Sequence, residues 1–171
     1  MIILGIDPGI AIVGWGVIEF QNNRFRTIAY GAITTEAGID VEVRLKLVYE
    51  ELCEIIEYYH PDQMAVEELF FTNNITTGIP VAEARGVILL AGIQHGLQIA
   101  EYTPMQVKSA ISGYGKAEKK QVMLMVAQIL RLKQVPKPDD TADALAIAVC
   151  HAHSAGSRLA SFYNQKKTRL T

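Results

Sequence analysis

Carboxylates stand where the sequence predicts that strands end and that the last helix begins. Asp7 follows an apolar run and precedes a Pro-Gly turn signal, so it should end a buried strand. Glu67 and Glu68 end a second apolar run. Asp140 and Asp143 stand three residues apart at the start of a predicted helix, and therefore on one face of it. Because ligand sites in α/β sheets favour strand ends, we expect carboxylates from both strands and from the helix to converge.

Four converging carboxylates would suit hard divalent cations. Mg²⁺ and Mn²⁺ prefer oxygen ligands, and two such ions about 4 Å apart can stabilise both the attacking water and the leaving oxygen of a phosphodiester. Simpler interpretations exist for each acid: Asp7 could be a turn residue, and Glu67 or Glu68 could face solvent. Asp139 or Asp140 could cap the last helix. The joint arrangement favours the metal site, because a carboxylate beside a nearly all-apolar strand is costly unless something binds it.

The spacing of apolar residues predicts a chain that forms strands first and then mostly helices. A Gln-Asn-Asn signal at 21–23 predicts a hairpin turn, and Pro80 should delay the start of the middle helix. We expect strands over 1–6, 13–20, 24–34, 63–69 and 97–102, and helices over 41–59, 81–96, 104–111, 117–132 and 139–155. This order predicts an α/β fold with a mixed five-stranded sheet flanked by helices.

Charge is distributed unevenly along the 171 residues, although the formal net charge is only −2. Residues 1–107 carry 5 basic and 14 acidic side chains, whereas residues 108–137 carry 7 basic and 1 acidic. A near-neutral protein of this kind can present one basic face, which is typical of polyanion binding. A solvated helix face explains the same lysines equally well.

Neither a membrane span nor an export signal is predicted. The apolar stretch over 86–100 is shorter than the roughly 20 residues of a spanning helix, and the N-terminus lacks the basic region of a secretory signal. Cys53 and Cys150 are the only cysteines and form no Cys-x-x-Cys pair. These features predict a protein of the reducing cytoplasm.

Six motifs, taken in order, resemble those of the RuvC family of Holliday-junction resolvases. They are Gly5-Ile6-Asp7-Pro8-Gly9, Gly14-Trp15-Gly16-Val17-Ile18, Ala65-Val66-Glu67-Glu68-Leu69-Phe70, Ala84-Arg85-Gly86-Val87, Gln106-Val107-Lys108 and Asp140-Thr141-Ala142-Asp143-Ala144-Leu145-Ala146-Ile147-Ala148. The resemblance spans residues 2 to about 153. It implies a ribonuclease-H-like fold and a Mg²⁺-dependent, homodimeric crossover junction endodeoxyribonuclease. Such an enzyme makes paired, symmetric nicks in four-way DNA junctions during recombination and repair.

The resemblance implies a role for each of the four acids. By position, the catalytic carboxylates and metal ligands would be Asp7, Glu67, Asp140 and Asp143. They would bind two Mg²⁺ ions, for which Mn²⁺ would substitute. The acidic neighbours of two of them, Glu68 and Asp139, stay secondary candidates. The implied reaction is hydrolysis, in which water attacks the phosphorus in line and the 3′ oxygen departs.

The resemblance also implies DNA contacts. Phe70, just beyond the catalytic strand, would stack on or wedge against an unpaired base at the crossover, or else pack in the core. Lys108 and Lys119 match basic positions near the active site and would neutralise phosphates. Lys116 and Lys120 would help them, unless they are simply solvated.

Further expectations concern Arg85, the tail and the partners. Arg85 matches a family residue that we expect to bind DNA, but an ion pair with Glu83 or with another helix fits it equally well. A nuclease domain is expected over 1–156, followed by a basic tail over 157–171 that is disordered and touches DNA. The small-residue face over 81–96 is the expected homodimer interface. The RuvA-RuvB branch-migration complex is a further expected partner.

Other classes of protein fit part of the pattern. A non-catalytic junction-binding protein would need the basic residues but not four matching acids. An actin-like ATPase shares the Gly-Ile-Asp-x-Gly motif, but its fold needs two such domains. A related ribonuclease-H-like nuclease acting on another branched or hybrid nucleic acid is the nearest alternative. The segment from Glu67 to Phe70 favours junction DNA.

Overall fold

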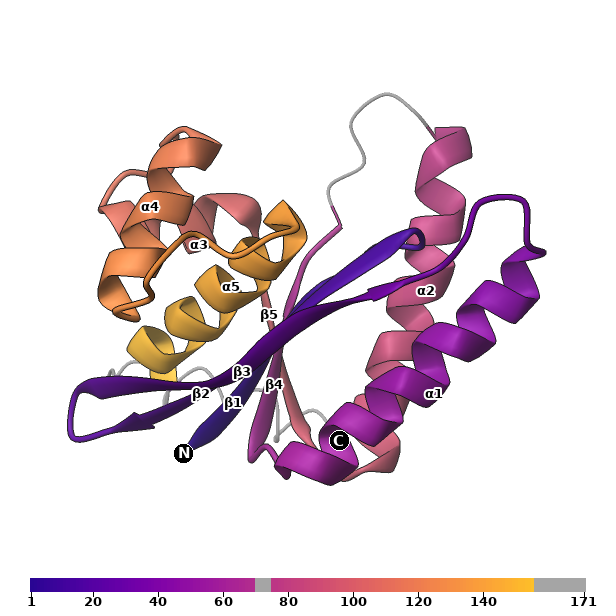
Figure 1. Ribbon diagram of the computed structural model, residues 1–171, viewed down its shortest axis with the longest axis horizontal. Helices are drawn as coiled ribbons and strands as arrows, with labels where there is room; N and C mark the ends of the chain where they lie inside the picture. The colour runs from indigo at the N-terminus through magenta and orange to yellow at the C-terminus, as the bar shows by residue number, and fades with distance from the viewer. Residues whose placement is uncertain (70–74, 156–171) are drawn as a thin grey trace, which may run out of the picture.

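A mixed sheet lies between two layers of helices in the computed structural model, which describes residues 1–69 and 75–155 (Figure 1). The strands are β1 (Ile2–Asp7), β2 (Ile12–Gln21), β3 (Arg24–Thr34), β4 (Gln63–Glu67) and β5 (Gln98–Tyr102), in the spatial order β3-β2-β1-β4-β5. Strand β1 pairs antiparallel with β2 and parallel with β4. On one side lie α1 (Val41–Tyr59) and α2 (Ile75–Gln94), and on the other α3 (Pro104–Ser112), α4 (Lys119–Ile129) and α5 (Asp139–Ala155). The expected α/β sheet with flanking helices is confirmed.

Local signals explain two of the boundaries. The hairpin turn between β2 and β3 lies at Asn22 and Asn23, whose φ angles of 53° and 57° are the left-handed values that a tight two-residue turn requires. Helix α1 ends at the predicted residue, because His60 adopts the left-handed conformation and its N–H bonds the Ile56 carbonyl.

The start of α2 differs from the prediction. The helix begins at Ile75 rather than near residue 81, and Pro80 lies inside it. Pro80 is the sixth residue of the helix, beyond the first turn, so it forgoes one backbone hydrogen bond to the preceding turn, and the helix continues past it nonetheless. The proline therefore did not act as the barrier that we expected. Strand β4 ends at Glu67, two residues earlier than predicted, and α4 is shorter than the expected 117–132.

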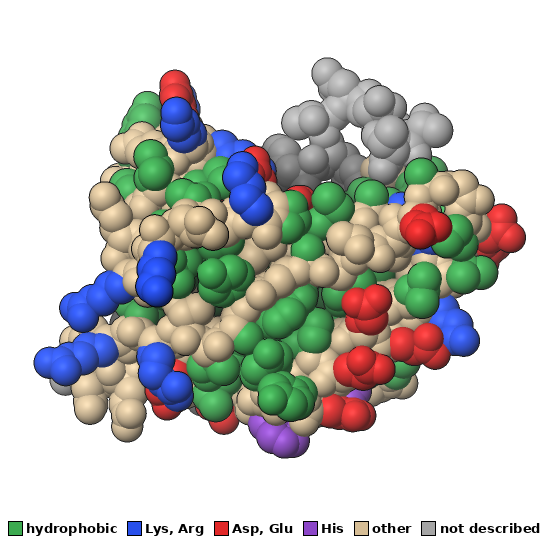
Figure 2. Space-filling model, viewed as in Figure 1, with side chains coloured by type: hydrophobic (Ala, Val, Ile, Leu, Met, Phe, Trp, Pro, Cys, Tyr) green, Lys and Arg blue, Asp and Glu red, His purple; other side chains and the backbone are tan. Residues whose placement is uncertain are grey.

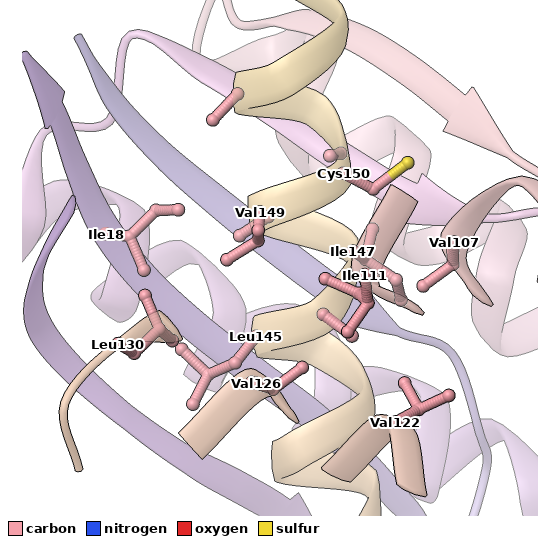
Figure 3. Packing of buried hydrophobic residues seen from close by; sticks show 14 of the residues in the cluster. Ile18, Val107, Ile111, Val122, Val126, Leu130, Leu145, Ile147, Val149 and Cys150 are labelled. Carbon is pink, nitrogen blue, oxygen red and sulfur yellow. The ribbon is translucent and has the colours of Figure 1, made fainter. Parts of the chain in front are cut away.

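Side chains alternate across the sheet, so each strand contributes to two cores. We call the side covered by α3, α4 and α5 the α5 face, and the opposite side the α2 face. On β1, Ile3 packs in the core of the α5 face, whereas Leu4 packs in that of the α2 face. Figure 3 shows the α5 face, where Leu145 and Val149 of α5 lie among residues of β2, α3 and α4. Helix α5 is therefore the centre of this core.

Two further observations concern the helices and the cysteines. None of the helices in residues 1–69 and 75–155 is both long and apolar enough to cross a membrane. Cys150 is buried, Cys53 is half-buried, and both are free thiols.

Candidate metal and nucleic-acid site

Glycines on the α5 face let α5 lie directly against the sheet. A β-carbon at Gly14 would stand 2.0 Å from the carbonyl oxygen of Asp140, and one at Gly5 would stand 2.2 Å from that of Ala144. Both distances are far shorter than real carbon–oxygen contacts, so only glycine fits at either position. The start of α5, which carries Asp140 in its first turn and Asp143 in the next, is thereby held close to β1 and β2.

The parallel pairing of β1 and β4 places two acids side by side. Ile6 pairs with Val66, so Asp7 and Glu67 follow at the neighbouring carboxyl ends of the two strands. Both side chains lie on the α5 face, because they alternate with the α2-face residues Ile6 and Val66. The structure thus brings Asp7 and Glu67 together with the two acids of α5.

The electrostatics show that these acids interact. Burial, followed by the charges of Glu67, Asp143 and Asp140, raises the pKa of Asp7 from 3.8 to about 8. Burial and the charge of Asp143 raise the pKa of Glu67 from 4.5 to about 7. Lys108 and Lys119 oppose the second shift, so both cations lie within electrostatic reach of Glu67. The positive charges of the two lysines therefore offset only part of the repulsion among the carboxylates.

Lys119, the first residue of α4, supplies a cation to this cluster. Its Nζ lies 2.8 Å from Oδ2 of Asp143. Burial acts to lower the pKa of Lys119, but the hydrogen bond and charge of Asp143, with the charges of Asp139 and Asp140, raise it overall. The ammonium therefore stays charged and offsets part of the repulsion among the carboxylates.

The chemistry of the four carboxylates fits a divalent cation, although their side chains are not arranged in a closed coordination shell. In residues 1–69 and 75–155, no group of three or more His, Cys, Asp or Glu side chains is arranged to hold a metal ion. The four carboxylates nevertheless offer the oxygen ligands that Mg²⁺ and Mn²⁺ prefer. Burial and mutual repulsion disfavour the ionised forms of Asp7 and Glu67, and a bound dication would reverse this.

The raised pKa values predict that the metal-free protein loses stability as pH rises. Asp7 and Glu67 are protonated in the folded state between their unfolded pKa values, near 4, and their folded values of about 8 and 7. In that window the folded state binds more protons than the unfolded state, so the free energy of unfolding falls with pH. We expect the melting temperature in EDTA to fall by about 5 °C or more between pH 5 and pH 8.

Calorimetry at several pH values, with EDTA and with Mg²⁺, measures this fall. Glu67→Gln removes one of the two titrating groups and should flatten the curve, whereas Glu51→Gln, on the exposed side of α1, should not. A metal-free melting temperature that is flat or rises from pH 5 to pH 8 would contradict the prediction.

The remaining candidate acids have other partners or positions. Asp139 accepts from Lys137 Nζ at 3.1 Å. Glu68 is half-buried, and its N–H donates to the Tyr102 carbonyl at 2.8 Å, one residue beyond β4. The charge of Asp139 also helps to raise the pKa of Lys119, so it reaches the cluster, and both acids stay secondary candidates.

The residues predicted to contact DNA lie in different environments. Lys108 is half-buried beside the cluster, and Lys116 and Lys120 are exposed. Phe70 lies outside the described residues, as does the tail from 156 to 171.

Arg85 does form an ion pair, but with Glu101 of β5 rather than with Glu83 or another helix. Sequence reasoning missed Glu101, although the alternation of β5 would have placed it on the face that α2 covers.

Charge also separates over the surface, as the sequence blocks predicted. In Figure 2, acidic side chains gather mostly over α1, and basic ones mostly over the side that carries α4 and the β2–β3 hairpin. Lys119 at the start of α4 joins the carboxylate cluster to the basic residues of that helix, whereas the β2–β3 hairpin lies at the opposite end of β1 and β2. This arrangement suits a polyanion whose backbone reaches the carboxylates.

In comparisons with known proteins, the sequence and the structure both match the same family. The family model described as crossover junction endodeoxyribonuclease RuvC matches residues 3–151. A protein of that name from Clostridioides difficile is 56% identical over 154 residues, covering 90% of this chain and 91% of that protein. One from Desulforamulus reducens is 57% identical over 152 residues, covering 89% and 93%. Thermus thermophilus RuvC, solved in complex with Holliday junction substrate, matches with a TM-score of 0.86 and 37% identity over 91% of this chain and 94% of that chain. The expected ribonuclease-H-like fold is confirmed by this match.

Proposed function

This chain belongs to the RuvC family of crossover junction endodeoxyribonucleases, and from that premise we propose that it resolves Holliday junctions. It would do so by paired, symmetric, metal-dependent hydrolysis of phosphodiester bonds in recombination and repair. One observation carries the proposal: acids from two parallel strands and from α5 interact at one end of the sheet, beside a basic surface. A non-catalytic junction-binding protein would have no use for carboxylates held at such an electrostatic cost.

We propose that the metal ligands are Asp7, Glu67, Asp140 and Asp143, and that they hold two Mg²⁺ ions, with Mn²⁺ as a substitute. When bound, such ions activate the attacking water and stabilise the departing 3′ oxygen. The protein contributes rigid placement, because two carboxylates end paired strands and two lie on a helix that glycines hold against those strands. Lys108 and Lys119 reach the cluster with positive charge and would stabilise the phosphate in the transition state.

The DNA would lie over the basic side. We propose phosphate contacts for Lys108, Lys116, Lys119 and Lys120, which belong to the most basic block of the chain. Phe70 follows the catalytic strand by three residues, and we propose that it stacks on an unpaired base at the crossover. The tail over 157–171 carries 4 basic residues and no acid, and we propose that it adds contacts to DNA outside the 1–156 nuclease domain.

Lys119→Ala should weaken junction binding and make it less dependent on salt. Removing one phosphate contact lowers the slope of log affinity against log salt by about one unit. Binding measured without divalent cation at several salt concentrations gives the slope. The matched control is Lys46→Ala. Lys46 is an exposed lysine of α1, the helix on the α2 face, and it pairs with Glu50 of the same helix. An unchanged slope in Lys119→Ala would remove this residue from the interface.

Paired nicks need two active sites, so we propose that the enzyme works as a homodimer. Helix α2 exposes Ile79, Leu90 and Ile93, with exposed fractions of 54%, 51% and 62%. With Gly86, where an added β-carbon would meet no described atom within 4 Å outside its own stretch of helix, they follow a near-heptad spacing along one side of the helix. A stripe of this kind suits a second copy of α2, which agrees with the expected interface over 81–96.

The setting of the reaction follows from its substrate. We propose that the protein acts in the cytoplasm, where junction DNA of a bacterium lies and where its two free thiols stay reduced. We also propose that the RuvA-RuvB branch-migration complex is its partner, because a migrating junction would present new crossover sequences to the active site.

The substrate test uses a mobile synthetic four-way junction, a linear duplex of matched sequence and an RNA–DNA hybrid, each with and without Mg²⁺. Symmetric nicks in the junction that require the metal are the expected result. Cleavage of the hybrid or the duplex alone would reassign the substrate to another ribonuclease-H-like activity. Tight junction binding without cleavage under either Mg²⁺ or Mn²⁺ would favour a scaffold instead.

A further inference from the structure

One basic side chain of α2, that of Arg85, reaches the ends of both β4 and β5. Its guanidinium forms an ion pair with the carboxylate of Glu101 on β5. Its Nε donates a long hydrogen bond, at 3.4 Å, to the backbone carbonyl oxygen of Glu67 on β4. Only 18% of the Arg85 side chain is exposed. A single half-buried cation therefore joins two neighbouring strands at the residue whose carboxylate belongs to the proposed active site.

Alternation along the strands places these contacts behind the active site. Val66 packs in the core of the α2 face and Ala65 in that of the α5 face, so the Glu67 carboxylate lies on the α5 face. Tyr102 packs on the α5 face, so its neighbour Glu101 lies on the α2 face. Arg85 thus contacts the backbone of Glu67 from the face that is opposite to the carboxylates.

We propose that Arg85 is a positioning residue, which fixes the Glu67 carboxylate through the backbone of β4. The proposal rests on the nuclease function proposed above. In the described part of the chain β4 ends at Glu67, and the backbone hydrogen bond past it joins the Glu68 N–H to the Tyr102 carbonyl, at 2.8 Å. Because a misplacement of about 1 Å can cost a catalytic group roughly a hundredfold in rate, a tie at this point would affect cleavage directly.

The same contacts argue against Arg85 as a phosphate ligand. To bind DNA, the guanidinium would have to leave Glu101 and abandon a carboxylate that is 40% exposed, with no other cation paired to it in the described part of the chain. It would also have to act from the α2 face, whereas the basic block containing Lys108 and Lys119 lies on the α5 face. Arg85 should therefore add little to junction affinity.

The test compares wild type with Arg85→Ala, Arg85→Lys and Glu101→Gln in the full chain. Three quantities are measured: the single-turnover cleavage rate at saturating junction and Mg²⁺, the junction Kd with its salt slope, and hydrogen exchange of the Glu68 amide without substrate. For Arg85→Ala we expect cleavage about tenfold to a hundredfold slower, a Kd within about twofold and an unchanged salt slope. Exchange of the Glu68 amide should become faster.

The other variants separate positioning from simple loss of stability. Lysine can pair with Glu101 but lacks the fork that also reaches Glu67, so Arg85→Lys should restore part of the rate. Glu101→Gln should slow cleavage in the same direction, although Glu101 lies on the opposite face from the cluster. Both variants keep a hydrogen-bonding side chain, and they test the proposal even if Arg85→Ala fails to fold. Lys46→Ala should match wild type in all three measurements.

Several results would overturn the proposal. A weaker Kd with a salt slope lower by about one unit would make Arg85 a phosphate contact. A lower melting temperature with unchanged cleavage and unchanged Glu68 exchange would make it a structural residue only. If wild type itself leaves the junction uncut, the proposed function fails. Exchange of the Glu68 amide then still decides whether Arg85 holds the end of β4.

Discussion

Asp7→Asn will abolish junction cleavage and leave the junction Kd within about twofold of wild type. Asparagine keeps the shape of the side chain but cannot supply the anionic oxygen that a divalent cation requires. Binding should persist, because the change removes a ligand of the proposed metal site and no basic phosphate contact. Cleavage and binding of the same synthetic junction measure the two effects. Retained cleavage in Asp7→Asn would show that the metal site has been placed on the wrong residues.

The same substitution should stabilise the metal-free protein. Burial and three neighbouring acids raise the pKa of Asp7 to about 8, so folding works against this carboxylate at every pH above its unfolded value of 3.8. A neutral amide escapes that cost, and we expect the free energy of unfolding in EDTA at pH 8 to rise by on the order of 2 kcal/mol. Mg²⁺ should raise the melting temperature of wild type and raise that of Asp7→Asn much less.

Glu51→Gln is the matched control for both effects. It also removes one negative charge, but from the exposed side of α1. Cleavage, Kd and the response to Mg²⁺ should stay at wild-type values. A metal-free Asp7→Asn that is less stable than wild type would mean that the Asp7 carboxylate has a favourable partner rather than a repulsive setting.

Features that depend on neighbours in the chain were predictable from the sequence. The end of β1 at Asp7 follows from the Pro-Gly that comes next, and α1 was predicted over its full length from apolar spacing and the His60-Pro61 stop. The strand-end rule was enough to expect Asp7 and Glu67 near each other, without knowledge of the strand order. Local signals therefore predicted where the acids would lie.

Features that depend on residues far apart in the chain were not predictable in this way. The pairing of Lys119 with Asp143 requires the packing of α4 against α5, and that of Arg85 with Glu101 requires α2 to cross the end of β5. Several acids were equally good partners for Arg85 from sequence alone. The extension of α2 through Pro80 was also missed, because the packing of the rest of the helix outweighs the backbone hydrogen bond that the proline cannot make.

Gly14→Ala should damage the site without touching any of its charged groups. The new β-carbon would stand 2.0 Å from the carbonyl oxygen and 2.3 Å from the carbonyl carbon of Asp140. Both are backbone atoms that no side-chain rotation can move, so the start of α5 must shift away from β2. We expect the protein to lose on the order of 3 kcal/mol of stability. Cleavage should fall by roughly a hundredfold, because Asp140 and Asp143 would move relative to Asp7.

Gly16→Ala separates this effect from overpacking in general. Gly16 lies two residues further along β2 on the same face, but its β-carbon would meet Cδ2 and Cγ of the Leu145 side chain, at 2.6 and 2.8 Å, with the nearest backbone atom at 3.4 Å. A leucine can change rotamer, so this variant should lose less stability, and its folded fraction should cleave at close to the wild-type rate. Thermal melts and single-turnover cleavage of both variants give the comparison. If Gly14→Ala cleaves as fast as Gly16→Ala, then close contact between β2 and the first turn of α5 is not what sets the position of the two α5 acids.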